Sequence, residues 1–203
     1  MSVAEEPLRR AVFLDRDGTL NVDPGYISDP KQIEVYLGVA AGLRRLSERG
    51  YLLVVITNQS GVSRGYYTHE TVEALHQRIR EILARRGAAI DAFYYCPHAP
   101  HEHCGCRKPG TELFERAARD HRIDLERSAV IGNMELDVEA GRRLGLLTAY
   151  VRSPGFYLEP DPGRGYGADI VAPNFLAACE AIVTRDPDGQ RSTRSPRTPE
   201  TKA

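Results

Sequence analysis

The chain has 203 residues, a length that suits one compact domain with a sizeable hydrophobic core. Hydrophobic residues make up 41% of it and charged residues 27%, which is typical of a soluble globular protein. The formal net charge of -1 gives no electrostatic reason to expect nucleic acid or an anionic membrane as a partner. It still allows a local basic pocket for a phosphorylated small molecule.

Short apolar segments alternate along the chain with helix-like segments. The apolar runs suit strands that are buried on both faces of a parallel sheet, and three of the helical segments end at a glycine, a common helix terminator. This alternation predicts an α/β fold, an open and mostly parallel sheet with helices on both faces. In chain order we expect strand 11–14, helix 40–49, strand 51–56, helix 68–86, strand 93–95, helix 111–121, strand 128–131, helix 135–144, strand 146–151, and a last strand and helix within 169–183.

The ends of the chain differ in composition from its middle. After Val183 there is no Val, Ile, Leu, Met or aromatic residue, so we place one domain at residues 8–184 and expect a disordered tail at 185–203. The Pro- and Gly-rich segment 155–167 is expected to be a surface loop. The first ten residues contain no apolar run typical of a secretory signal, and no segment is apolar enough to cross a membrane, so we expect a cytoplasmic protein.

Polar motifs follow several of the expected strands, and ligands of such sheets bind beyond the carboxyl ends of the strands. Asp15 and Asp17 come directly after the first strand. Because adjacent carboxylates repel each other, a divalent cation is their natural partner, and magnesium uses one or two carboxylates together with phosphate oxygens. This pair therefore predicts a magnesium site that handles a phosphorylated compound.

A second cluster combines cysteine and histidine. Three of the four cysteines lie within a short segment beside three histidines, which favours metal binding over disulfides. Three thiolates and one imidazole suit tetrahedral zinc with no open position. The fourth cysteine, Cys179, is expected in the core. The candidate ligands are Cys96, His98, Cys104 and Cys106, with His101 and His103 as alternatives to His98.

The motif DRDGTL at residues 15–20 resembles the first motif of the haloacid-dehalogenase-like phosphatase superfamily. The resemblance implies that Asp15 attacks the phosphorus and forms an aspartyl-phosphate, while Asp17 acts as general acid and then as general base. Thr57 matches the second motif of the family and would hydrogen-bond the phosphoryl group. Lys108 matches the third motif and would offset its charge.

Longer segments are similar to one subfamily, the D-glycero-D-manno-heptose 1,7-bisphosphate phosphatases. These are DRDGTLNVDPGYISDP, TNQSGVSRG, YYCPH and CGCRKP, spread over roughly residues 11–150. The resemblance implies hydrolysis of the sugar 7-phosphate and a structural zinc in which His98 is the histidine ligand. Only about twenty residues separate Asp17 from the helix that begins near Val39, which leaves no room for a large cap domain, and we expect a monomer. The substrate-binding residues that the resemblance implies are Asp23, Pro24, Gly25, Tyr26, Thr57, Asn58, Gln59, Ser60, Arg107 and Lys108.

The fourth family motif is altered here. Its first Asp, normally a magnesium ligand, is Asn133, and the following residue, often Lys in the heptose enzymes, is Met134. The lost charge matters, because two unit charges 4 Å apart at an effective dielectric of 20 interact by about 4 kcal/mol. We expect Asn133 and Asp137 to complete the magnesium site with Asp15 and Asp17; alternatively, Asp137 is only a helix-surface residue.

Two further readings of the sequence stay open. The loop between His98 and Cys104 has the short length common in histidinol-phosphate phosphatases, which are close relatives of the heptose enzymes. Asn133 also allows a homologue with a weakened metal site that binds a phosphorylated ligand without turnover. The intact Asp15, Asp17, Thr57 and Lys108 favour an active phosphatase.

Overall fold

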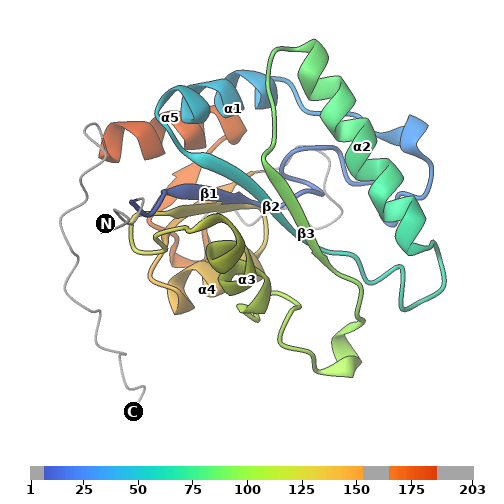
Figure 1. Cartoon of the computed structure of the whole chain (residues 1–203). Helices are drawn as coiled ribbons and strands as arrows, with labels where there is room; N and C mark the ends of the chain where they lie inside the picture. The colour runs from blue at the N-terminus through green and yellow to red at the C-terminus, as the bar shows by residue number, and fades with distance from the viewer. Residues whose placement is uncertain (1–6, 153–164, 187–203) are drawn as a thin grey trace, which may run out of the picture.

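The computed structural model describes residues 7–152 and 165–186. Six strands form one sheet in the order β3-β2-β1-β4-β5-β6, and every neighbouring pair is parallel. The predicted α/β fold is therefore confirmed (Figure 1). The elements are β1 Ala11–Leu14, α1 Val39–Glu48, β2 Leu52–Asn58, α2 His69–Arg85, β3 Ala92–Cys96, α3 Glu112–His121, β4 Ala129–Gly132, α4 Glu135–Arg143, β5 Leu147–Val151, β6 Ile170–Ala172 and α5 Phe175–Arg185.

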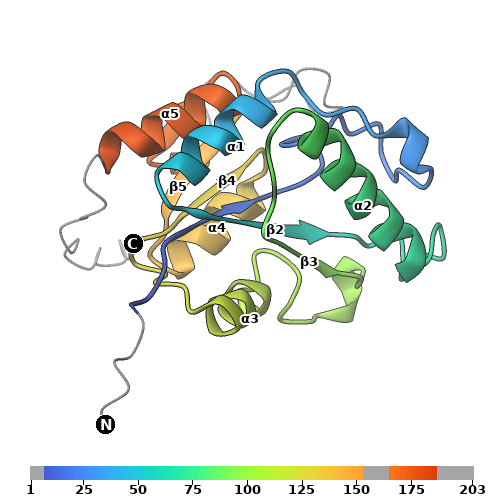
Figure 2. The same ribbon diagram turned by 45° about the horizontal axis from the view of Figure 1, so that its top comes forward.

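Each face of the sheet is covered by its own group of helices. Helices α1, α2 and α5 lie on one face and α3 and α4 on the other, with α1 and α5 side by side (Figures 1 and 2). Alternate strand residues point to opposite cores. Val12 and Leu14 belong to the core beneath α1, α2 and α5, whereas Ala11 and Phe13 belong to the core that contains Phe114 of α3. Burial on both faces explains why β1 is apolar throughout.

The predicted element boundaries differ from the observed ones by at most two residues. Helices α1, α2 and α4 are followed by Gly50, Gly87 and Gly145, which have φ values of 77°, 68° and 71° and end the helices as predicted. Strand β2 continues to Asn58, so Thr57 is part of the strand. Three short 3-10 helices, at Pro30–Gln32, Pro100–Glu102 and Gly165–Gly167, were not predicted, because such turns carry little periodic signal.

The strand register brings the carboxyl ends of β1, β2 and β4 to one edge. Leu14 pairs with Val55 of β2 and with Ile131 of β4. The Asp15 backbone N–H then donates to the Ile131 carbonyl at 2.9 Å. Between β1 and α1 the chain forms loops and one 3-10 turn, so no large cap domain is inserted there. The residues that follow β1, β2 and β4 therefore lie close together at one edge of the sheet.

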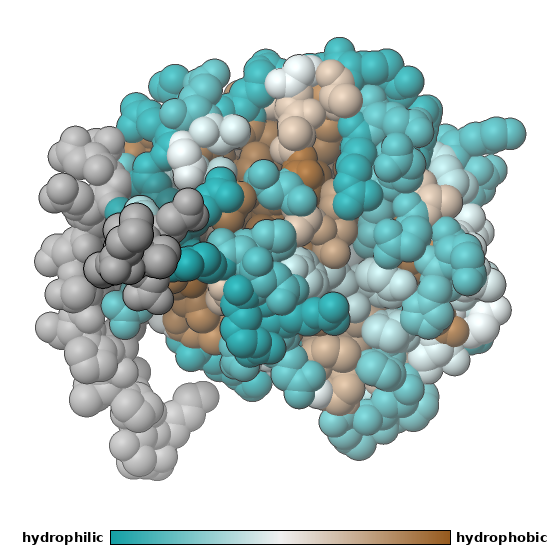
Figure 3. Space-filling view, viewed as in Figure 1, coloured by the Kyte–Doolittle hydropathy of each residue, from teal (hydrophilic) through white to brown (hydrophobic). Residues whose placement is uncertain are grey.

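The surface seen in Figure 3 is largely hydrophilic, with hydrophobic side chains visible mainly between the helices. Among the described residues, no helix has the length and apolar character needed to cross a membrane. Asp186 follows α5 and is buried, and it forms a 2.6 Å ion pair with Arg10. Most of the expected loop at 155–167, and residues 187–203 of the expected tail, lie outside the described residues.

Candidate active site

A pocket of about 270 Å³ lies at the carboxyl edge of the central strands. It is formed by the residues that follow β1 and β2, by the segment before α3 and by the start of α4. Its walls include Asp15, Arg16, Asp17, Asp23, Gly25, Tyr26, Ile27, Thr57, Asn58, Gln59, Tyr67, Arg107, Lys108, Met134, Leu136 and Asp137.

Lys108 lies between two buried carboxylates at the bottom of this pocket. Its Nζ is 2.5 Å from Oδ1 of Asp15 and 2.6 Å from Oδ1 of Asp137, and it also donates to the Ile56 carbonyl at 2.7 Å. Asp137 is 1% exposed, which excludes its alternative interpretation as a helix-surface residue. Gly132 permits the close approach of Asp137, since a Cβ at position 132 would come within 2.2 Å of the carboxyl group.

The charges of this cluster shift one another's protonation. The pKa of Asp15 is raised to about 7, mainly by burial; Lys108 opposes the rise, while the charges of Asp137 and Asp17 contribute to it. The pKa of Lys108 is raised, because Asp137 and Asp15 together outweigh its own burial. Two carboxylates thus share one ammonium group. A further cation near Asp15 would favour the ionised form, which is the form that can attack phosphorus.

Asp17 is held by a cage of donors. The Arg16 guanidinium contacts both of its carboxylate oxygens, from Nε at 2.9 Å and from Nη2 at 2.6 Å. Asn21 Nδ2 and Gln59 Nε2 donate to the same carboxylate at 3.0 and 2.8 Å. Although burial acts to raise the pKa of Asp17, Arg16 and these donors hold it below its usual value. The carboxylate therefore has one fixed orientation in the pocket wall.

Gln59 connects this cage to two other groups. Its Nε2 also donates to Thr57 Oγ1 at 2.9 Å, and its Oε1 accepts from Arg16 and from the Tyr67 hydroxyl at 2.9 and 2.8 Å. Gln59 is 1% exposed. Its amide is thus occupied by protein groups, and its role in this structure is to support Thr57 and Asp17.

The backbone of Lys108 is fixed by Asn58. The Asn58 side chain accepts from the Lys108 N–H at 3.0 Å and donates to its carbonyl at 3.3 Å. This double contact holds the segment before α3 against the end of β2. Lys108 therefore approaches Asp15 from a backbone that is itself anchored.

Asn133 lies at the end of β4, 5% exposed. The Thr19 hydroxyl is 3.4 Å from both Asn133 Oδ1 and Asp15 Oδ2, so the two oxygens contact the same hydroxyl group. Carboxylate and amide oxygens are the ligands that magnesium accepts. Asp15 and Asn133 thus fit a magnesium site. The oxygens of Asp137 face Lys108 and the Met134 N–H, the latter at 3.1 Å.

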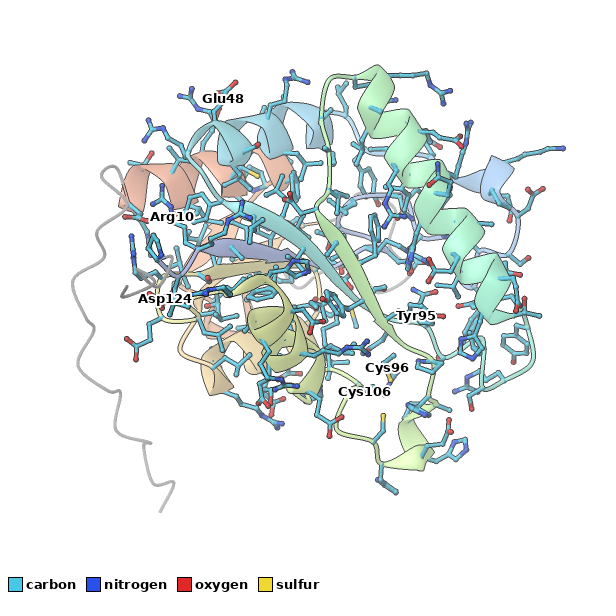
Figure 4. The ribbon with its side chains drawn as sticks, viewed as in Figure 1. Arg10, Glu48, Tyr95, Cys96, Cys106 and Asp124 are labelled. Atoms are coloured by element: carbon cyan, nitrogen blue, oxygen red, sulfur yellow. The ribbon has the colours of Figure 1, made fainter. Side chains whose placement is uncertain are left out.

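The cysteine and histidine cluster forms beside the pocket. The ligand atoms of Cys96, His98, Cys104 and Cys106 all lie within 4.8 Å of one another. Cys96 and Cys106, which approach each other at the end of β3 in Figure 4, have their sulfurs 3.1 Å apart. A tetrahedral zinc with sulfur ligands at 2.3 Å needs sulfur–sulfur separations of about 3.8 Å, so these four residues fit with small adjustments. Cys179 is fully buried in the core, as expected.

Most of the residues predicted for the site meet in the pocket. Pro24, Ser60 and Asn133 are not part of its wall, although each is next to a residue that is. Sequence reasoning missed Arg16, Asn21 and Tyr67. Arg16 had a signal, because a cation between two carboxylates in an apolar context is expected to pair with one of them; Asn21 and Tyr67 depend on contacts that no local pattern shows.

Two family models match the chain. Residues 105–178 match the HAD-hydrolase-like family, and residues 13–141 match the polynucleotide kinase 3 phosphatase family. Together with the fold and the pocket, they define a HAD-like phosphatase. The protein of Thermosynechococcus vestitus named D-glycero-D-manno-heptose-1,7-bisphosphate 7-phosphatase is 38% identical over 190 residues, which are 87% of this chain and 96% of that protein. The chain belongs to this heptose-bisphosphate phosphatase family.

Other similar proteins carry the same family name. The D-glycero-beta-D-manno-heptose-1,7-bisphosphate 7-phosphatase of Helicobacter pylori is 46% identical over 133 residues, 65% of this chain and 77% of that protein. Among solved structures, the D,D-heptose 1,7-bisphosphate phosphatase of B. bronchiseptica, complexed with magnesium and phosphate, has a TM-score of 0.75 at 27% identity. The match covers 87% of this chain and 99% of that one. The family resemblance seen in the sequence is therefore confirmed.

We predict that Arg16→Met lowers the free energy of unfolding by about 3 kcal/mol, because it leaves Asp17 and Gln59 without a buried charged partner. Chemical denaturation at neutral pH measures this. Arg80→Met is the matched control: Arg80 lies 4.4 Å from the centre of the Phe93 ring, a contact worth about 1 kcal/mol. An equal loss in both variants would contradict a special role for the Arg16 cage.

Proposed function

We propose that this phosphatase removes the 7-phosphate of D-glycero-D-manno-heptose 1,7-bisphosphate through an aspartyl-phosphate on Asp15. The observation that supports it most directly is the buried contact of Asp15 with Lys108, 2.5 Å long, at the bottom of the pocket. The names of the relatives supply the substrate.

In the first step of the proposed reaction, an Asp15 carboxylate oxygen attacks phosphorus and the bond from phosphorus to the sugar oxygen breaks. Lys108 and the Thr57 hydroxyl are close enough to the pocket floor to stabilise charge on the phosphoryl oxygens. The leaving sugar oxygen takes a proton from Asp17. Asp17 rests as a carboxylate, and the arrival of the anionic phosphate favours its protonated form.

In the second step, water attacks the phosphorus of the aspartyl-phosphate and releases inorganic phosphate, which restores Asp15. Asp17 accepts the proton of that water. Its hydrogen bonds with Arg16, Asn21 and Gln59 hold the carboxylate in one orientation. One carboxylate thus serves both steps, with the proton returned in the second.

We assign magnesium to Asp15 and Asn133, with Asp17 and Asp137 as further candidates, whose carboxylates pair with Arg16 and Lys108 respectively in this structure. Bound there, magnesium would neutralise phosphate charge and favour the ionised form of Asp15. The magnesium in the B. bronchiseptica structure supports the assignment.

We assign zinc to Cys96, His98, Cys104 and Cys106, as a structural ion. The loop that they close leads directly to Arg107, whose Nη1 donates to the His98 carbonyl at 3.3 Å. Arg107 lines the pocket, so the ion would hold a cation in place for the substrate. Reduced cysteines of this kind suit a cytoplasmic location.

We expect the purified protein to release phosphate from heptose 1,7-bisphosphate in the presence of magnesium, and Asp15→Asn to reduce the rate by on the order of a thousandfold or more. Asp120→Asn, at the exposed end of α3, is the control and should retain activity. Histidinol phosphate in the same assay tests the alternative substrate. No turnover at any magnesium concentration would favour a homologue that binds without catalysis.

Asn133→Asp should lower the magnesium concentration needed for half-maximal activity by about tenfold, because it restores a negative charge beside Asp15. Titration of activity against magnesium measures it. Asn174→Asp is the control. Residue 174 caps the N-terminus of α5 and is not part of the pocket wall, and Asp can form the same cap, so the magnesium requirement should stay unchanged. If Asn133→Asp and the wild type require the same magnesium concentration, residue 133 is not a magnesium ligand.

Native mass spectrometry should show one chain carrying one zinc ion. Cys104→Ser should lose the ion, because sulfur ligands dominate the affinity of such sites. Cys179→Ser, in the core, should keep it. A metal-free wild-type chain, or a dimer, would contradict the zinc or the monomer assignment respectively.

A further inference from the structure

Tyr26, which lines the pocket, contacts a second tyrosine, Tyr66, and neither ring has a part in the proposed chemistry. Tyr26, in the loop after β1, and Tyr66, between β2 and α2, contact each other edge to face, with ring centroids 4.8 Å apart and an interplanar angle of 82°. They are 49% and 57% exposed. Large aromatic side chains that stay exposed next to a pocket are typical of a ligand-contacting surface.

The backbone at Tyr26 is held in an unfavourable conformation. Tyr26 has φ of 44°, in the left-handed region that bulky residues avoid, and it follows Gly25 with φ of 87°. The Asp23 carboxylate accepts from the Gly25 N–H at 2.8 Å and stabilises this turn. Such strain persists where the surrounding structure imposes it, and it is concentrated at functional sites.

Each exposed tyrosine is followed by a buried anchor. Ile27 is 3% exposed and Tyr67 is 9% exposed, and both line the pocket. Tyr67 is fixed by its hydrogen bond to Gln59, and the Tyr66 N–H donates to the Gly61 carbonyl at 2.8 Å. The two rings therefore project from anchored backbone, and their arrangement exists before any ligand binds.

We infer that Tyr66 is a specificity-determining residue, because it holds the Tyr26 ring in place as an aromatic wall for the sugar of the substrate. This rests on the proposed function. The pocket, about 270 Å³, is slightly smaller than the roughly 300–1,000 Å³ of sites that enclose drug-sized ligands. With one phosphate at Asp15, the carbon chain of a sugar bisphosphate extends to the mouth.

The chemistry of the wall suits a sugar. The C–H groups of a sugar pack against aromatic faces, and the tyrosine hydroxyls can exchange hydrogen bonds with sugar hydroxyls. Tyr66 would act on Tyr26 as well, because the edge-to-face contact holds the Tyr26 ring at the pocket wall. The wall would thus favour phosphates of long or cyclic polyols over small phosphorylated compounds that do not reach the mouth.

The test compares two substrates of the wild-type enzyme with magnesium: heptose 1,7-bisphosphate, and acetyl phosphate, which carries no sugar. Tyr66→Ala should raise KM for the heptose bisphosphate about tenfold with little change in kcat. The ratio of kcat/KM for the two substrates should fall by about the same factor. Tyr66→Phe, which keeps the ring, should retain most of the wild-type KM.

Tyr166→Ala is the matched control, since Tyr166 forms a similar edge-to-face pair with Tyr150, at 5.4 Å and 80°, and neither ring of that pair is part of the pocket wall, whereas Tyr66 contacts Tyr26, which is. It should leave the substrate ratio unchanged. An unchanged KM in Tyr66→Ala, or an equal loss on both substrates, would overturn the inference while the proposed function stands. If the wild type does not hydrolyse heptose bisphosphate, the proposed function fails, and the inference fails with it.

Discussion

The site depends on one buried ammonium group placed between two carboxylates. Lys108 pairs with Asp15 and Asp137 where water has little access, and each charge there would be costly alone. The three residues come from the end of β1, from the segment before α3 and from α4. The three charges can pair with one another only when these elements pack correctly. The cost of an unpaired buried charge in turn disfavours other packings.

Around this cluster, side chains that do not react hold those that do. Asn58 fixes the backbone of Lys108, and Gln59 links Thr57 to Asp17. The cysteine and histidine loop orients Arg107 through the His98 carbonyl. The reacting groups thus sit on a strand end or on anchored loops, which limits the reorganisation that the reaction requires.

The sequence was sufficient to predict the parallel sheet and the meeting of Asp15, Asp17, Thr57 and Lys108 in one pocket. Strand 11–14 was predicted with its exact bounds, because burial on both faces leaves an unbroken apolar run, and Asp15 was located by its place after that run. The contact of Gln59 with the cage of Asp17 could not be predicted. Gln59 reaches Arg16 and Asp17 only in the folded chain, and a sequence separation of some forty residues carries no periodic signal. The partner of Asp137 was unpredictable for the same reason.

The order of the strands has a consequence for how the molecule comes to be active. β1 lies between β2 and β4, which are separated from each other by two helices and by β3 along the chain. Parallel pairing of such distant segments is slow, because the chain loses the entropy of closing a long loop before it gains the contacts that compensate for that loss. A partly synthesised chain that lacks β4 has neither Asn133 nor Asp137 beside Asp15. The pocket around Asp15 is therefore incomplete until β4 and α4 have joined the sheet.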